Sequence, residues 1–198
     1  CIYSRTALEF SVLAAAFINE LMESYDDHFS EILNGVKLHQ GQQEIAAIMR
    51  KILLDSYKIK KKNRNKPEEG SKFKEKIQEY YSLRCVPQIL GPILDTLNQA
   101  EKVLINEMNS VSDNPIIDVI NDKILHGGNF HGDYVSLEMD KLRIAMTKLS
   151  ILLERQLNYL IADYLNEKFP KFLNFGKPGF NFGVQGIQFT ATSTVAEN

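Results

Sequence analysis

The fold of this 198-residue chain is decided by one stretch, residues 133–168, which reads DYVSLEMDKLRIAMTKLSILLERQLNYLIADYLNEK. Apolar side chains recur along it at near-heptad spacing, which predicts one continuous helix of about 35 residues, or roughly 50 Å at 1.5 Å per residue. A helix of this length that is apolar over a wide face needs partner helices, and it favours partner subunits as well. The predicted stripe consists of Leu142, Ala145, Leu149, Leu152, Gln156, Tyr159 and Asp163, widened by Leu153, Leu157, Leu160 and Tyr164.

The helical period also dominates the rest of the chain. Residues 116–125 differ, because they predict a small β-hairpin that turns at Asn121 and Asp122. The fold class is therefore mainly α, a bundle of long helices with a small β-hairpin. The further predicted helices cover residues 7–25, a short stretch from Ser30, residues 42–54 and residues 87–109. In the first of these, the spacing assigns the core face to Leu13, Ala16, Phe17, Leu21 and Met22.

Residues 56–76 interrupt the helical pattern. They combine a run of lysines and an arginine with Pro67 and Gly70, which predicts a flexible surface loop. Residues 1–198 otherwise form a single helical segment. The chain opens at Cys1 without a methionine and runs almost at once into helical sequence, so we expect it to be a piece of a longer polypeptide.

Composition indicates a soluble globular protein, with 44% hydrophobic and 24% charged residues. The net charge of −2 creates no field that would recruit nucleic acid or an anionic membrane. The basic run within residues 58–66 also lacks interleaved aromatic residues, so we expect no nucleic-acid partner. No apolar run is long enough to span a bilayer, and no secretory signal is visible. Cys1 and Cys85 make no disulfide framework, so the expected location is the reducing cytoplasm.

The most informative chemistry lies in residues 78–88, QEYYSLRCVPQ. They place an amide, a phenol and a guanidinium, those of Gln78, Tyr81 and Arg84, in one short loop before a helix that starts near Pro87. An arginine fork matches both oxygens of a carboxylate, and a helix N-terminus adds backbone N–H groups and a positive dipole end. The loop therefore predicts a binding site for a small carboxylate.

Two further motifs follow along the chain. In residues 110–115, Pro115 pushes Asn114 out of the α region, and either Asp113 or Asn114 can close an Asx turn. Residues 126–132, HGGNFHG, carry three glycines around Phe130, and glycine lets backbone approach backbone or ligand closely.

Each candidate residue also has a simpler interpretation. Arg84 would pair with an internal acid such as Glu79, and Tyr81 would be a buried phenol of the core. Asn114 would only stabilise the turn before Pro115, and Phe130 would only pack against neighbouring residues. His126 and His131 suggest a metal, but no third ligand follows at metal-site spacing, so we expect no metal.

Taken in order, residues 81–88, 112–115 and 127–132 resemble the motifs of the aromatic amino-acid ammonia-lyases. This family contains histidine, phenylalanine and tyrosine ammonia-lyases and related aminomutases. Residues 154–156 and 196–198 resemble further family marks, so the resemblance covers essentially all of the chain. It implies that the chain is a fragment of the ammonia-lyase fold, which is of the fumarase/aspartase type.

The resemblance also implies a prosthetic group, the electrophile 4-methylidene-imidazol-5-one (MIO), formed from an Ala-Ser-Gly tripeptide. No Ala-Ser-Gly occurs in this sequence, so we expect the MIO on a segment before Cys1. In the family, the β-proton of an aromatic amino acid is removed and ammonia leaves, giving an aryl-acrylate. That proton is barely acidic, so an electrophile must supply most of the activation. The family further implies a homotetramer whose active sites are shared between subunits.

The resemblance assigns a role to five residues of this chain. Arg84 resembles the anchor of the substrate carboxylate, and Asn114 resembles a second carboxylate contact. Tyr81 resembles the catalytic tyrosine beside the MIO, and Gln78 resembles an amide that hydrogen-bonds in the same cluster. Phe130 resembles the aromatic residue that packs near the MIO and the substrate.

Three functions remain open at this stage. The first is an ammonia-lyase acting on tyrosine, phenylalanine or histidine. The second is an MIO-dependent 2,3-aminomutase, which returns the amine to the β-carbon and which these residues do not separate from a lyase. The third is a catalytically inactive helical assembly fragment, because the isolated 198 residues hold only half a binding site.

Overall fold

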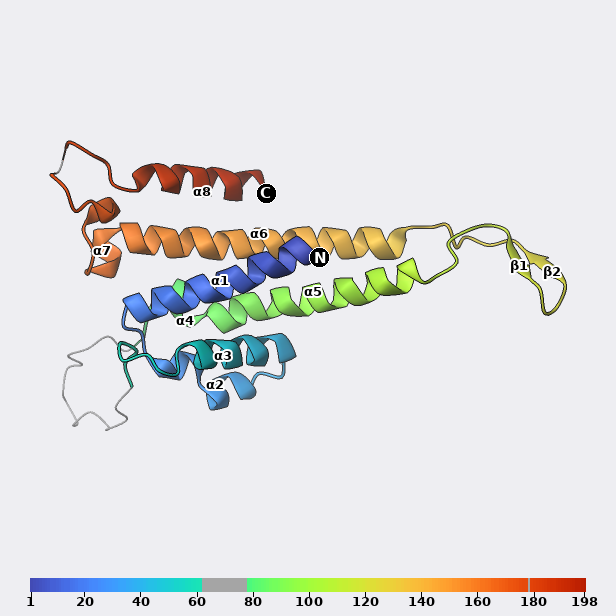
Figure 1. Cartoon of the computed structure of the whole chain (residues 1–198), viewed down its shortest axis with the longest axis horizontal. Helices are drawn as coiled ribbons and strands as arrows, with labels where there is room; N and C mark the ends of the chain where they lie inside the picture. Colours follow the sequence, from blue (N-terminus) through green and yellow to red (C-terminus); the bar gives the residue numbers. More distant parts are fainter. Residues whose placement is uncertain (62–77, 178) are drawn as a thin grey trace.

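The structure is a computed structural model that describes residues 1–61, 78–177 and 179–198. The described residues form a helical bundle with one two-stranded sheet, which confirms the predicted fold class (Figure 1). The elements are α1 (Ile2–Leu21), η1 (Asp26–Phe29), α2 (Glu31–Gly35), α3 (Gln40–Ile52), α4 (Tyr81–Arg84), α5 (Val86–Met108), β1 (Ile116–Asp118), β2 (Lys123–Leu125), α6 (Asp133–Ile161), α7 (Asp163–Asn166), η2 (Lys171–Leu173) and α8 (Gln185–Glu197).

The long helices lie side by side (Figure 1). Helix α5 packs against α6 along one side and against α3 along the other, and α8 packs on the far side of α6. Helix α1 crosses this layer and contacts α3, α5 and α6. The β1–β2 hairpin projects beyond the C-terminal end of α5, whereas α4 lies at the N-terminal end of the same helix.

The core is formed where α1, α3, α5 and α6 meet. In α5 the buried positions Leu90, Ile93, Leu94 and Leu97 follow helical spacing. Full burial of one such side chain stabilises the fold by roughly 1.5–3 kcal/mol. The predicted stripe of α6 is confirmed at six of its members and is wrong at Asp163, which is exposed. The buried members are Leu142, Ala145, Leu149, Leu152, Gln156 and Tyr159.

Helices α3 and α5 approach each other through two glycines. A Cβ atom added to Gly91 would lie 2.5 Å from the backbone nitrogen of Gln42, and one added to Gly41 would meet the carbonyl of Gly91. No real side chain tolerates such contacts, so this packing requires glycine at both positions.

The predicted core face of α1 is partly wrong. Leu13, Phe17 and Leu21 are 37%, 54% and 42% exposed, and the buried face instead runs through residues such as Val12 and Ala15. Both sides of this alanine-rich helix are apolar, so its pattern alone does not decide which side faces the core. The complete set of buried α1 residues is Leu8, Ser11, Val12, Ala15, Ala16 and Asn19.

The prediction of one helix over residues 133–168 is wrong at its C-terminal end. Helix α6 stops at Ile161, because Ala162 adopts an extended backbone with φ −96° and ψ 98°. The buried amide of Asn166 donates to the carbonyls of Tyr159, Leu160 and Ala162 at 3.1, 3.1 and 2.8 Å. An asparagine side chain here replaces the N–H groups that would have continued the helix.

The hairpin is confirmed. Strands β1 and β2 pair antiparallel with Ile116 opposite Leu125, and Asp122 in the turn has a positive φ of 49°. The Asp118 carboxylate accepts hydrogen bonds from the backbone N–H groups of Ile120 and Asn121 at 3.1 and 3.2 Å. These bonds close the turn locally.

The predicted flexible loop, residues 56–76, lies outside the described residues from position 62 onwards. Its first part runs beside the end of α1, because the N–H of Asp26 donates to the carbonyl of Lys60 at 3.0 Å and the N–H of Lys60 donates to that of Ser24 at 2.9 Å. Across residues 1–61, 78–177 and 179–198, none of the helices combines the length and apolarity needed to cross a membrane.

Candidate functional site

Tyr81 and Arg84 lie three residues apart on α4, so their side chains share one face of this short helix. The Arg84 guanidinium carbon lies 4.6 Å from the centroid of the Tyr81 ring, a cation–π arrangement. The Tyr81 side chain is 71% exposed, which rules out a phenol buried in the core. Gln78, which precedes α4, is also exposed.

The guanidinium of Arg84 is half-buried, and no acid among the described residues neutralises it. Within the described part of the chain, Arg84 makes no ion pair, so the alternative of an internal pair with Glu79 is wrong. Its Nε is buried and has no hydrogen-bond partner in residues 1–61, 78–177 and 179–198. A guanidinium held in this way retains donors for an incoming carboxylate.

A cavity of about 380 Å³ lies beside α4, between that helix and α6. Tyr81 lines it from one side, and Lys148, Arg155 and Tyr159 line it from α6. The Tyr159 hydroxyl is buried, and no described residue hydrogen-bonds to it. Burial, reinforced by the negative charge of Glu79, raises the pKa of Tyr159 to about 12, so this phenol keeps its proton at neutral pH.

Further buried polar atoms without a hydrogen-bond partner come from the residues around α4. They are the amide oxygens of Asn19, Gln88 and Gln156, in addition to Arg84 Nε and the Tyr159 hydroxyl. Native proteins satisfy most buried polar groups, so such a concentration calls for an explanation. A site that is completed by a ligand or by further polypeptide explains it.

Cys85 directly follows Arg84 but is not an activated nucleophile. Burial raises the pKa of its thiol, and the charge of Arg84 only partly opposes this effect. The thiol therefore stays protonated at neutral pH.

Asn114 and Phe130 lie at the other end of α5, in the loops that flank the hairpin (Figure 1). The Oδ1 atom of Asn114 accepts a hydrogen bond from the N–H of Gly127 at 2.8 Å, which joins these two loops. Among the residues described, none accepts a hydrogen bond from Asn114 Nδ2. The side chain of Phe130 is 62% exposed, and its ring lies 6.4 Å from that of His131.

The five predicted site residues therefore form two separate groups. Gln78, Tyr81 and Arg84 precede α5, whereas Asn114 and Phe130 follow it. The helix between them has 23 residues, which is roughly 34 Å at 1.5 Å per residue. One amino acid cannot contact both groups within a single chain.

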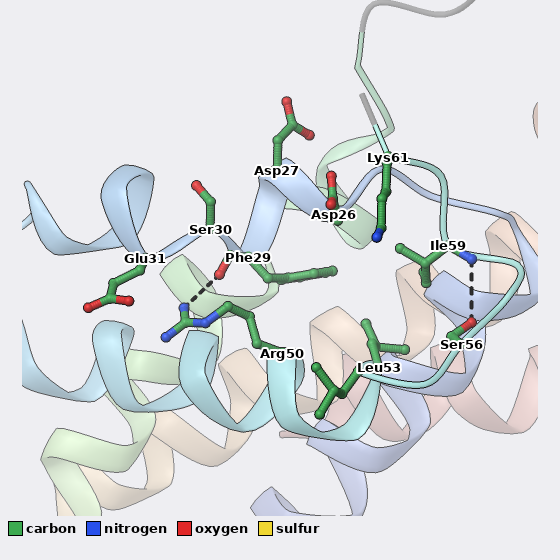
Figure 2. Close-up of a pocket in the computed structure, with 11 residues that line it drawn as sticks. Asp26, Asp27, Phe29, Ser30, Glu31, Arg50, Leu53, Ser56, Ile59 and Lys61 are labelled. Atoms are coloured by element: carbon green, nitrogen blue, oxygen red, sulfur yellow. Dashed lines mark hydrogen bonds between the residues drawn. The ribbon is translucent and has the colours of Figure 1, made fainter. Parts of the chain in front are cut away.

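A second cavity, of about 490 Å³, contains none of the predicted residues. Figure 2 shows it between η1, the end of α3 and residues 53–61, with Phe29, Leu53 and Ile59 as apolar walls. Arg50 lines it, but its guanidinium already donates to the carbonyl of Phe29 at 2.7 Å. The cavity is therefore not a counterpart of the Arg84 site.

His126 and His131 do not form a metal centre with their described neighbours. Throughout the described ranges, no three His, Cys, Asp or Glu side chains gather in a way that could hold a metal ion. The Nδ1 atom of His131 instead lies 2.9 Å from a carboxylate oxygen of Asp133.

Comparison with known proteins identifies the family to which this helical bundle belongs. A model of the aromatic amino acid lyase family matches residues 1–198. The chain therefore belongs to this family, as its motifs at residues 81–88, 112–115 and 127–132 indicated.

Individual relatives agree with this assignment. The chain is 37% identical to the tyrosine ammonia-lyase of Cupriavidus metallidurans over 94% of its own length and 36% of that protein. It is 34% identical to the MIO-dependent tyrosine 2,3-aminomutase of Streptomyces globisporus over 97% of its own length and 37% of that protein. Among solved structures, the phenylalanine aminomutase of Pantoea agglomerans superposes with a TM-score of 0.88 at 30% identity, covering 98% of this chain and 39% of that one. The chain thus spans well under half the length of these relatives.

Proposed function

We propose that this chain is the part of an aromatic amino-acid ammonia-lyase, or of a related 2,3-aminomutase, that binds the carboxylate of the substrate. The observation that carries the proposal is the state of Arg84. Its guanidinium stacks on the exposed Tyr81 ring, pairs with no acid among the described residues and keeps a buried Nε without a partner. A bidentate carboxylate would satisfy this group.

We further propose that each active site is completed by a second chain. The length of α5 separates Arg84 from Asn114 and Phe130, so one substrate reaches both groups only if they come from different subunits. This separation supports a homotetramer with shared sites, in which the free Nδ2 of Asn114 donates to the same carboxylate and Phe130 packs against the aromatic ring.

The prosthetic group of such an enzyme, MIO, supplies the electrophile that makes the loss of the amine possible. The site fits a neighbouring group of this kind, since two buried donors near α4, Arg84 Nε and the Tyr159 hydroxyl, lack partners among the described residues. No Ala-Ser-Gly tripeptide occurs in these 198 residues, so the MIO would be carried elsewhere in the complete protein.

The residues of this chain would then bind and orient the substrate and move a proton. Arg84 fixes the carboxylate, which orients the Cα–Cβ bond of the substrate. The phenol oxygen of Tyr81, exposed beside the guanidinium, takes part in proton transfer. Gln78 hydrogen-bonds in the same cluster.

The choice between deamination and amine migration depends on whether ammonia escapes or returns to the β-carbon. The named relatives include both reactions, and both of those compared by sequence act on tyrosine. We therefore propose tyrosine as the first substrate to test, with phenylalanine and histidine next. The 198 residues alone are expected to be inactive, because they hold only half of each site.

The test is the substitution Arg84→Ala in the complete protein. Loss of a charged, hydrogen-bonded partner should weaken transition-state binding by about 2–3 kcal/mol, which lowers kcat/KM roughly 30- to 150-fold. Ultraviolet absorbance of the aryl-acrylate measures deamination, and chromatography of the β-amino acid measures migration. Arg143→Ala is the matched control, because Arg143 is an exposed arginine of α6 that only approaches Asp140 at 3.6 Å. If KM and kcat/KM are the same for both variants, Arg84 does not anchor the substrate.

A further inference from the structure

Helix α4 is too short to fix its own side chains. It spans four residues, and it is interrupted from α5 at Cys85, where φ is −97° and ψ is 17°. In a continuous helix the carbonyl of Leu83 would accept a hydrogen bond from residue 87, but Pro87 has no N–H to donate. Something outside α4 must therefore satisfy and fix this turn.

Two buried amides from different helices supply that support. Asn19 Nδ2, on α1, donates to the carbonyl of Leu83 at 3.3 Å. Gln156 Nε2, on α6, donates to the carbonyl of Ser82 at 2.9 Å. Asn19 and Gln156 are 0% and 1% exposed, so neither amide can exchange this bond for one to bulk water.

The side chain of Leu83 adds a third constraint. It is fully buried and packs in a small cluster with Met22, the residue after α1, and Tyr159 of α6. With Leu83 held on the inner side and two carbonyls held by amides, rotation of α4 is prevented. Tyr81 and Arg84 are consequently presented outwards with a fixed direction.

We infer that Gln156 and Asn19 are positioning residues for the carboxylate anchor, acting through the backbone of α4 on Arg84. This inference rests on the proposed function of Arg84. Neither amide touches the substrate; each sets the geometry in which the guanidinium meets it. A displacement of about 1 Å at a site of this kind can cost about 100-fold in rate.

The experiment is a double-mutant cycle in the complete protein with Gln156→Met, which keeps the length of the side chain and removes its donor. Alone, Gln156→Met should lower kcat/KM by about 10- to 100-fold. In an Arg84→Ala background the same change should cost less than about threefold, because the anchor it positions is already absent. Asn19→Ser, which replaces the second amide by a shorter hydroxyl side chain, should behave in the same way and serves if Gln156→Met does not fold.

The matched control is Asn34→Leu. Asn34 is also a buried amide that donates to backbone carbonyls, those of His28 and Ser30 at 3.2 and 3.0 Å, but it lies on α2. It should lower the melting temperature as Gln156→Met does while leaving kcat/KM within about twofold.

The outcomes separate the two ideas. If Arg84→Ala has no effect, the proposed function fails. If Arg84→Ala is impaired but Gln156→Met lowers kcat/KM no more than Asn34→Leu does, or lowers it by the same factor in both backgrounds, the positioning role is overturned.

Discussion

The two ends of α5 are built in opposite ways. At the α4 end, Leu83 is fully buried and two amides from separate helices hold the backbone. At the hairpin end, the apolar residues Val119 and Ile120 are 85% and 94% exposed, and the turn is closed by local bonds from Asp118. The chain's own core thus completes one group of site residues and leaves the other to be covered from outside.

This difference bears on how a shared site would work. A short hairpin alone has marginal stability in water, and exposed apolar residues in a group indicate an interaction surface. The α4 end would then be a preformed part of the site, and the hairpin end would reach its final geometry only against neighbouring polypeptide.

The test with the largest expected effect on this difference between the two ends of α5 is subunit complementation. Arg84→Ala and Asn114→Ala should each strongly lower kcat/KM of the complete protein, one from each end of α5. If sites are shared between chains, co-expression of the two variants should restore about a quarter of the sites, because a random mixture pairs an intact α4 end with an intact hairpin end that often. The aryl-acrylate assay on the purified mixture measures this recovery.

Two controls complete this experiment. The separately purified variants should keep their low activity when assayed alone, and mixing without subunit exchange should restore nothing. A co-expressed mixture no more active than its components would show that the two groups do not meet in one site shared between chains.

A second test compares the stability of the two ends. Leu83→Ala should lower the free energy of unfolding of the complete protein by about 2–5 kcal/mol, because it opens a cavity in a closed cluster. Ile120→Ala should leave the folding of the subunit nearly unchanged and instead make thermal unfolding more dependent on protein concentration. If both variants lost the same free energy of unfolding and neither showed a dependence on protein concentration, the hairpin would be packed against the core of its own chain.

The smallest expected effect concerns two carboxylates. Glu23 accepts a hydrogen bond from Lys168 at 2.5 Å, which together with the Lys168 charge holds its pKa below its ordinary value of 4.5. A lowered carboxyl pKa gives stability that is present above the ordinary value and is lost as the pH falls below it. Glu23→Gln should therefore flatten the acid side of the stability–pH curve slightly, and salt should reduce the effect because the pair is exposed.

Asp118 is the second of these carboxylates, and it lies in the hairpin. Hydrogen bonds from Asn121 lower its pKa as well, but within one turn. Urea titrations between neutral pH and acid should therefore show no change in global unfolding for Asp118→Asn. If Asp118→Asn changed the pH dependence of global unfolding more than Glu23→Gln, the hairpin would contribute more to global stability than this comparison predicts.

The sequence predicted the features that depend on one-dimensional spacing. The stripe of α6 and the hairpin follow from residue periods. Tyr81 and Arg84 were predicted to lie in a loop, and this was wrong, because both lie on the short helix α4. The predicted end of α6 failed because it depends on the side chain of Asn166, and hydrogen bonds between side chain and backbone leave no periodic signal.

Features that need three-dimensional neighbours were missed for a related reason. The core face of α1 depends on which helix lies beside it, and the contact of Gly41 with Gly91 joins residues 50 positions apart. One feature of the sequence did indicate how α4 is held in place: Gln156 is a polar residue at a core position of the α6 stripe. Such a residue should prompt a search for the carbonyl it serves. The roles of Gln78, Tyr81, Arg84, Asn114 and Phe130 stay predictions until the variants are assayed.

The antiparallel, side-by-side packing of α5 and α6 has a consequence for engineering. Because residues 109–132 lie between the end of α5 and the start of α6, they form a segment that could be exchanged with that of a relative without disturbing the pocket near α4. Such chimaeras should still bind the substrate carboxylate but differ in which aromatic ring they prefer, provided that α5 and α6 keep their lengths.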